Sequence, residues 1–129
     1  MAGIVKTMQG KQGFVALTGA SSEQIGLAEE ALGVKFAKEY KEYVSAHGAA
    51  SFENHELTGV CASRRLNVVD VTEAERLKYP EISKDWYLLE QLNIDDVSIW
   101  QAGSGEVYQL MPGAEPVRLY GSLSEYIGG

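Results

Sequence analysis

The stretch from Trp86 to Tyr120, WYLLEQLNIDDVSIWQAGSGEVYQLMPGAEPVRLY, decides the fold. It contains four runs rich in apolar and aromatic residues, separated by short polar or Gly- and Pro-containing segments; the runs are 86–92, 97–102, 106–111 and 117–120. Short connections join antiparallel neighbours, because parallel strands need a crossover of about a dozen residues or more. We therefore predict an antiparallel meander of four strands.

Two helices are predicted upstream of this meander. Ser21–Gln24 has the pattern of a capping box, in which a serine hydroxyl is followed three residues later by a side chain that reaches back. Apolar residues then recur at helical spacing, and Gly33 suits the left-handed position that ends a helix. A second helix is predicted from Ala37 to about Ala46. Helices followed by an antiparallel sheet indicate the α+β class.

The segments around this frame give weaker signals. Residues 56–61 are predicted to form a strand, and residues 67–71 an extended segment. Thr72 is predicted to cap a short helix through Leu77, and residues 122–127 a last helical turn. At 129 residues the chain matches one domain.

We assign residues 21–129 to this single domain. Residues 1–20 form an N-terminal segment for which the sequence predicts no definite structure. Four glycines weaken any helix there, although residues 14–17 suit an anchor or a short strand.

The charge of the chain is unevenly distributed. The formal net charge is −7; residues 1–80 carry ten acids and nine bases, whereas residues 81–129 carry eight acids and two bases. Such a surface repels phosphate backbones and favours encounter with a basic partner, although solubility alone is the other explanation of the charge.

No apolar run approaches the roughly 20 residues of a membrane span. Cys61 is the single cysteine, which fits a reducing cytoplasm and predicts a cytoplasmic protein.

The chain also resembles a known family. Three groups of residues carry the resemblance, in this order: IGLAEEALGVKF (25–36) with EYKEY (39–43), HGAASF (47–52) with ELTGV (56–60), and GEVY (105–108) with SLSEYI (122–127). Together they resemble the SUKH superfamily, specifically bacterial relatives of the fungal Smi/Knr cell-wall regulator. The family usually has a proline where this chain has Ala37.

This resemblance implies helices packed on an antiparallel sheet. It also implies that the protein is an immunity protein that neutralises a cognate polymorphic toxin, often a nuclease.

Two partial motifs for catalysis or cofactor binding fail. His55–Gly59 begins like a zinc-protease helix but has a glycine where the second histidine is required. Gly103–Tyr108 begins like a dinucleotide-binding fingerprint, but it lacks the last glycine and leads into a predicted strand. We predict no enzyme activity, no cofactor and no metal.

A non-catalytic cytoplasmic immunity protein that binds a basic toxin domain is therefore the predicted function. The alternative is an intracellular scaffold or regulatory module of the fungal type. The partner is predicted to be a protein, with no direct nucleic-acid or membrane binding, and the oligomeric state stays open. The aromatic residues would anchor the partner and the acids would steer it; the predicted contact residues are Trp86, Tyr87, Glu90, Asp95, Asp96, Trp100 and Glu106.

Overall fold

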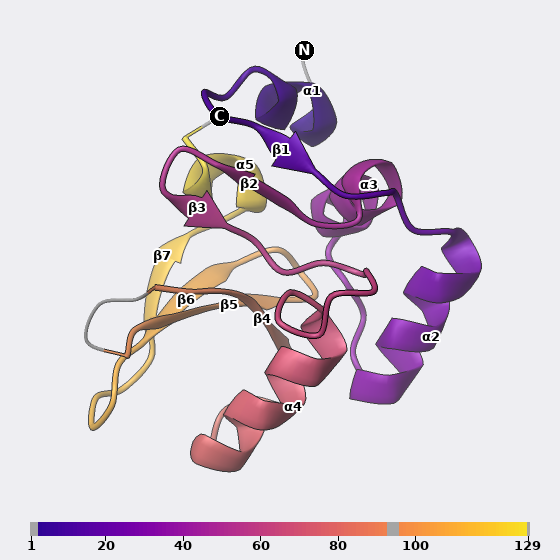
Figure 1. Ribbon diagram of the computed structural model, residues 1–129. Coiled ribbons are helices and arrows are strands. Elements are labelled where there is room, and N and C mark those ends of the chain that lie inside the picture. Colours follow the sequence, from indigo (N-terminus) through magenta and orange to yellow (C-terminus); the bar gives the residue numbers. More distant parts are fainter. Residues whose placement is uncertain (1–2, 93–95, 129) are drawn as a thin grey trace.

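Four antiparallel strands form the larger of two sheets in the computed structural model, which describes residues 3–92 and 96–128 (Figure 1). They lie in chain order, with the bounds β4 Trp86–Gln91, β5 Ser98–Ala102, β6 Val107–Leu110 and β7 Val117–Tyr120. The predicted meander is confirmed, with each strand end within one residue of its expected place. Residues 103–105 turn between β5 and β6, as expected.

The smaller sheet has three short antiparallel strands. Its order is β1-β2-β3, with the bounds β1 Val15–Ala16, β2 Ala50–Phe52 and β3 His55–Glu56. The strand predicted over 56–61 ends at Glu56. Beyond it the backbone changes neighbours, since the Thr58 N–H donates to the carbonyl of Leu89 in β4 at 2.8 Å. This segment therefore connects the two sheets instead of extending the smaller one.

Five helices complete the fold of the described residues. Their bounds are α1 Ile4–Gln9, α2 Ser22–Leu32, α3 Lys38–His47, α4 Val68–Lys78 and α5 Leu123–Tyr126. The capping box of α2 is present: the Ser21 hydroxyl accepts from the Gln24 N–H at 3.1 Å, and the Gln24 side chain accepts from the Ser21 N–H at 2.9 Å. Gly33 ends α2 in the left-handed region at φ 68°. The helices predicted from residues 21–33 and 37–46 are thus confirmed, as is the last helical turn.

The prediction for residues 67–77 is wrong at its start. Asn67 caps α4 by accepting from the Val69 N–H at 2.9 Å, so the cap lies five residues before the predicted cap at Thr72. Thr72 is buried within the helix, and its hydroxyl accepts from the Leu88 N–H of β4 at 3.0 Å. Its hydroxyl therefore fixes α4 on the sheet and caps nothing.

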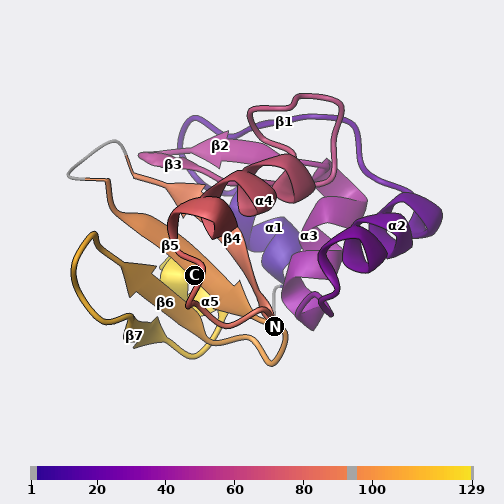
Figure 2. The same cartoon turned by 90° about the horizontal axis from the view of Figure 1, so that it is seen from below.

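The hydrophobic core has two parts on opposite faces of the larger sheet. The main part includes Tyr87 and Leu89 and extends to α1, α2, α3 and α5, while Leu88 belongs to a smaller cluster with Trp100 beneath α4 (Figure 2). Because successive residues of a strand point to opposite faces, β4 contributes side chains to both clusters. The α1 helix, which the sequence left open, buries Ile4 and Met8 in the main core. Within the described residues, no helix is both long and apolar enough to cross a bilayer.

Candidate protein-binding groove

Of the three aromatic residues predicted to contact a partner, Trp86 is the one whose side chain reaches the surface. It begins β4 opposite Ala102 of β5, and its indole stacks on the Tyr108 ring of β6 with the centroids 4.1 Å apart and the planes at 18°. The side chain is only partly buried. A rigid aromatic side chain that is held by a neighbouring ring and still exposed suits an interface anchor.

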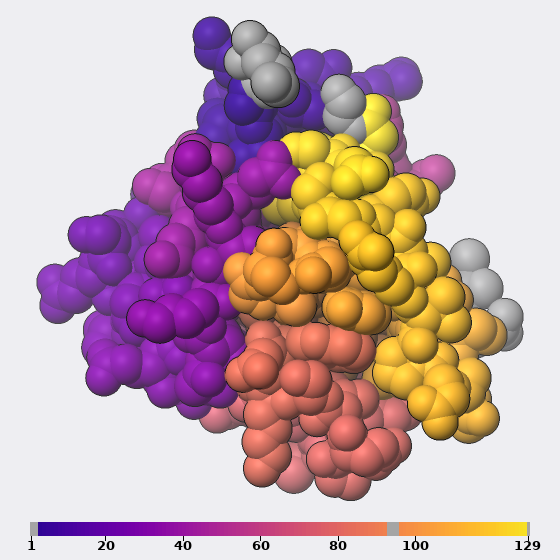
Figure 3. Space-filling view, turned by 180° about the vertical axis from the view of Figure 1, so that it is seen from behind, coloured from indigo at the N-terminus to yellow at the C-terminus, as the bar shows by residue number. Residues whose placement is uncertain are grey.

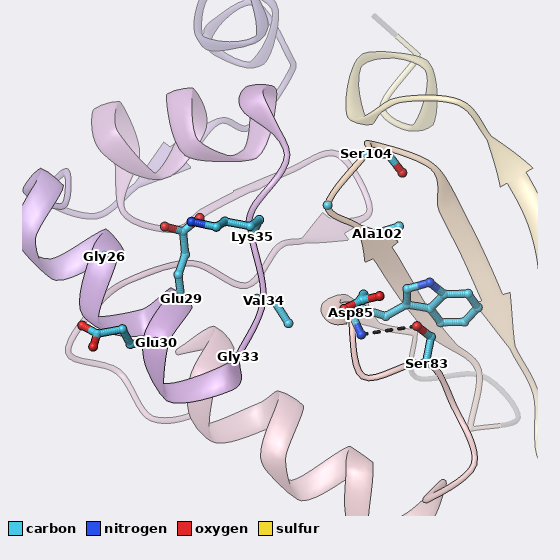
Figure 4. Close-up of a pocket in the computed structure, with 12 residues that line it drawn as sticks. Gly26, Glu29, Glu30, Gly33, Val34, Lys35, Ser83, Asp85, Ala102 and Ser104 are labelled. Carbon is cyan, nitrogen blue, oxygen red and sulfur yellow. Dashed lines mark hydrogen bonds between the residues drawn. The ribbon is translucent and has the colours of Figure 1, made fainter.

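A groove of about 760 Å³ lies beside Trp86, a size typical of binding sites. It is bounded by α2, by the connection that leads to α3, by the loop before β4 and by the β5–β6 turn (Figure 4). In the space-filling view, these parts of the chain adjoin on one face of the molecule (Figure 3). The lining residues are Gly26, Glu29, Glu30, Gly33, Val34, Lys35, Ser83, Asp85, Trp86, Ala102, Gly103 and Ser104.

Close backbone packing sets one wall of the groove. A Cβ atom at Gly103 would lie 2.6 Å from the carbonyl oxygen of Lys35. Such a separation is below van der Waals contact, so a glycine is needed where the β5–β6 turn meets the connection after α2. The turn residue that the sequence assigned to a hairpin therefore also closes one end of the groove.

The groove is negatively charged on balance, with three carboxylates and one lysine in its lining. Glu29 is held within the protein, because it accepts from the Phe36 N–H at 2.8 Å and lies 3.5 Å from the Lys41 ammonium. Glu30 and Asp85 are exposed. Ser104 donates to the neighbouring Glu106, and this hydrogen bond lowers the pKa of Glu106. Glu106 thus lies beside Ser104, which lines the groove, although Glu106 itself does not line it.

Tyr87 and Trp100 are in the interior instead. Both side chains are 0% exposed. The Tyr87 hydroxyl donates to the Gln101 side chain at 2.7 Å and accepts from the Ala37 N–H at 3.0 Å, and the Trp100 indole N–H donates to Ser98 at 2.9 Å. Because a contact residue must reach the surface, burial is incompatible with the predicted role of these two aromatic residues. They hold the sheet to its helices.

Glu90, also predicted as a contact, is a buried carboxylate that connects three elements. It is 2% exposed and accepts from the Glu56 N–H at 3.0 Å, from His55 Nδ1 at 2.7 Å and from the Tyr126 hydroxyl. The hydrogen bond to Glu90 is the main cause of a raised pKa at His55, and burial raises the pKa of Tyr126. A buried carboxylate with three donors ties β4 to β3 and α5, so direct contact with a partner is incompatible with its position as well.

Asp96, another predicted contact residue, lies away from the groove. Asp96 is exposed and has a left-handed backbone at φ 56°, a conformation that aspartate tolerates in turns. It precedes β5 and lies at the opposite end of the β4–β5 ladder from Trp86. The prediction for Asp95, and most of the turn predicted over 93–96, fall outside the described residues.

The sequence did not point to Gly26, Glu30, Lys35 or Asp85 as site residues. They come from three separate segments, and only the packing of α2 beside the β5–β6 turn brings them together. Gly26 could have been noticed in the sequence, since a glycine inside a well-capped helix is destabilising relative to alanine. Cys61 is partly buried, and burial raises the pKa of its thiol.

Comparison with known proteins gives one match. A SUKH family model with the description SMI1-KNR4 cell-wall matches residues 1–127, nearly the whole chain. No curated protein shows significant similarity to the chain.

Proposed function

Because the chain belongs to the SMI1-KNR4 family of the SUKH superfamily, we propose that it is a non-catalytic immunity protein that binds and neutralises a cognate toxin domain. Members of this family are generally non-catalytic. The observation that carries the proposal is the groove beside Trp86, in which a partly exposed aromatic side chain shares a lining with the exposed carboxylates of Glu30 and Asp85. Aromatic anchors surrounded by charged groups are typical of protein interfaces.

The charge of the groove supports a basic partner. Three acids and one base line it, and Glu106 lies close by. A nuclease toxin must present a basic surface to hold nucleic acid, so its active-site surface would be attracted to this groove. Opposite charge also speeds association, which suits a protein that must capture a toxin before the toxin acts. The cytoplasm is the proposed site of action, in keeping with the single cysteine.

The direct test uses the product of the gene immediately upstream of this chain's gene, which the proposal expects to contain the toxin domain. Host cells that express this domain should survive only when the chain is co-expressed, and the two purified proteins should form a complex. Raising the salt concentration from about 50 mM to 500 mM should weaken the complex at least about tenfold, because screening weakens opposite-charge attraction. The absence of a complex at low salt, together with undiminished toxicity, would reject the proposal.

A regulatory module with a housekeeping partner is the second candidate. The description of the matching family refers to the cell wall, which favours this reading. Deleting the gene separates the two functions. If the deletion strain tolerates the toxin domain as well as the parent but grows poorly under cell-wall stress, the regulatory function is supported and the immunity function is rejected.

A further inference from the structure

We propose that β7, the free edge of the larger sheet, pairs with an extended segment of a protein partner that has basic residues at its ends and adds to the four-stranded sheet as one further strand. This rests on the proposed function only in that the partner is a basic protein. The proposal goes further in placing a second contact surface outside the groove and in naming the conformation of the partner segment that it binds.

The two outer strands of the larger sheet differ in how their backbones are hydrogen-bonded. In β4, the Leu89 carbonyl accepts from the Thr58 N–H at 2.8 Å. The Leu88 N–H donates to the Thr72 hydroxyl at 3.0 Å, and the Leu88 carbonyl accepts from the Thr58 hydroxyl at 2.7 Å. Among the described residues, the backbone of β7 hydrogen-bonds to β6 and to no other segment, and it forms the outer margin of the sheet (Figure 2). An unpaired edge of this kind is a template for another strand.

The β7 strand is also apolar and exposed. All four of its residues are exposed, and the exposed fractions of Val117, Leu119 and Tyr120 are 52%, 37% and 41%. Of the eight large apolar residues on the surface of the described part of the chain, four lie within residues 111–120. Single exposed apolar residues are ordinary, but a group of them on one strand marks an interaction surface.

The pairing of β7 with β6 directs two of these side chains to one face of the sheet. Val117 lies opposite Gln109. Beyond a register shift, Tyr120 lies opposite Val107, two residues before Gln109 and therefore on the same face. The Tyr120 ring contacts the Tyr126 ring of α5 with the centroids 5.9 Å apart, so this is the face that carries α5. Alternate side chains of an added strand would rest on Val117 and Tyr120.

The charges around β7 decide the kind of partner. Glu115 is exposed two residues before the strand, and Glu125 lies near its other end, because a Cβ atom at Gly121 would be 3.0 Å from the Glu125 carboxylate. Arg118 is the one basic residue of the four, so the basic residues of an added segment belong at its ends. Acids at both ends of β7 attract such a segment, whereas a second copy of the chain carries a net charge of −7 and is repelled.

Blocked hexapeptides of lysine–valine–threonine–valine–threonine–lysine test the edge without a protein partner. In a two-dimensional NMR titration, this basic peptide should shift the amide signals of residues 117–120 and slow their exchange with deuterium. A peptide with glutamate in place of both lysines should bind about tenfold more weakly. A peptide N-methylated at its four central residues has lost the donors needed for strand pairing and should not bind measurably. Equal binding of either matched probe, or shifts confined to other surfaces, would overturn the proposal.

Variants of the edge then identify the groups involved. Val117→Lys and Leu119→Lys place a repelling charge on the strand and should each weaken the basic peptide at least about tenfold. Glu115→Gln and Glu125→Gln should each weaken it about threefold. Leu77→Lys is the matched control, because Leu77 is an exposed apolar residue of α4, and it should leave binding unchanged. Thermal unfolding checks that each variant is folded, and unchanged binding in folded Val117→Lys and Leu119→Lys proteins would contradict the proposal.

Sedimentation velocity tests the alternative occupant of the edge, which is a second copy of the chain. We expect a monomer at all protein concentrations, because two acidic edges repel each other. A dimer that Leu119→Lys converts to a monomer would show that β7 pairs with itself, and it would overturn the assignment of a basic partner.

The same variants separate this inference from the proposed function. If the upstream gene product binds the parent, Val117→Lys and Leu119→Lys proteins equally well, immunity stands and the assignment of β7 fails. If that product binds none of them but the basic peptide adds to β7, the assignment of β7 stands and the immunity function fails.

Discussion

The centre and the rim of the larger sheet use the same types of side chain in opposite ways. At the centre, Trp100 is 0% exposed and lies beneath α4. Glu90, near the far end of β4, is also enclosed: it is 2% exposed and accepts from three donors of β3 and α5. At the rim, Trp86 is only partly buried and Asp85 is exposed beside a groove. The difference comes from coverage: helices close both faces of the sheet at its centre, while the start of β4 projects past them. Residue type therefore indicates an interface only where the fold leaves the sheet uncovered.

Truncating the two tryptophans should give the largest contrast. Trp100→Ala leaves a cavity in the cluster beneath α4 and should lower the free energy of unfolding by about 3–5 kcal/mol. Trp86→Ala loses the stacking on Tyr108 and only part of the packing on this cluster, because Trp86 is partly exposed, and should cost about 1–2 kcal/mol. Urea unfolding of both variants measures the difference. Equal losses would show that the rim supports the fold as much as the centre does.

Removing a single buried oxygen should give the next largest effect. The Tyr43 hydroxyl donates to the Thr58 carbonyl at 2.7 Å and accepts from the Ala50 N–H at 2.9 Å. Tyr43→Phe leaves both backbone groups without this partner and should cost about 1–3 kcal/mol. Tyr120→Phe is the matched control at the rim, since Tyr120 is 41% exposed, and it should leave the urea midpoint nearly unchanged. A comparable loss of stability in Tyr120→Phe would contradict the distinction between buried and exposed hydroxyl groups.

The sequence predicted the parts of the fold that depend on local signals. The α2 helix follows from Ser21, Gln24 and Gly33, all within 13 residues, and the meander follows from short turn-rich separators. The start of α4 was misjudged because Val68, Val69 and Val71 favour a strand by residue type. The Asn67 cap and burial against β4 outweigh that preference, since tertiary packing commonly overrides intrinsic propensity.

The site was less predictable because it depends on contacts between distant residues. Of the predicted contact residues, Trp86 lines the groove, but one of its other walls comes from α2, more than 50 residues earlier. Nothing in the local sequence indicated that Glu90 would be enclosed by His55 and Tyr126, which are 35 and 36 residues away. Residues far away in the sequence therefore decide whether a carboxylate is buried and hydrogen-bonded or lies on the surface.

The buried tie at Glu90 should make stability depend on pH. The raised pKa of His55 in the folded protein comes mainly from its hydrogen bond to Glu90; the charge of Glu53 adds to the rise, and Lys11 opposes it. The stabilisation is fully present below the unfolded pKa of about 6.5 and is lost as pH rises through the higher folded value. The urea midpoint should therefore fall as pH rises above about 6.5. His55→Gln should flatten this slope, and an unchanged slope in that variant would assign the pH dependence to another group.

The smallest expected effect is an increase in stability, at an exposed position of α2. Gly26→Ala adds a Cβ atom that meets nothing within 4 Å, so the gain in helix propensity should raise the free energy of unfolding by about 0.5–1 kcal/mol. Gly103→Ala is the matched contrast, because its Cβ would lie 2.6 Å from the Lys35 carbonyl and should destabilise the protein. Thermal and urea unfolding of both variants decide the point. If Gly26→Ala lowers stability, α2 itself needs a glycine at this position, and the expectation from helix propensity is wrong.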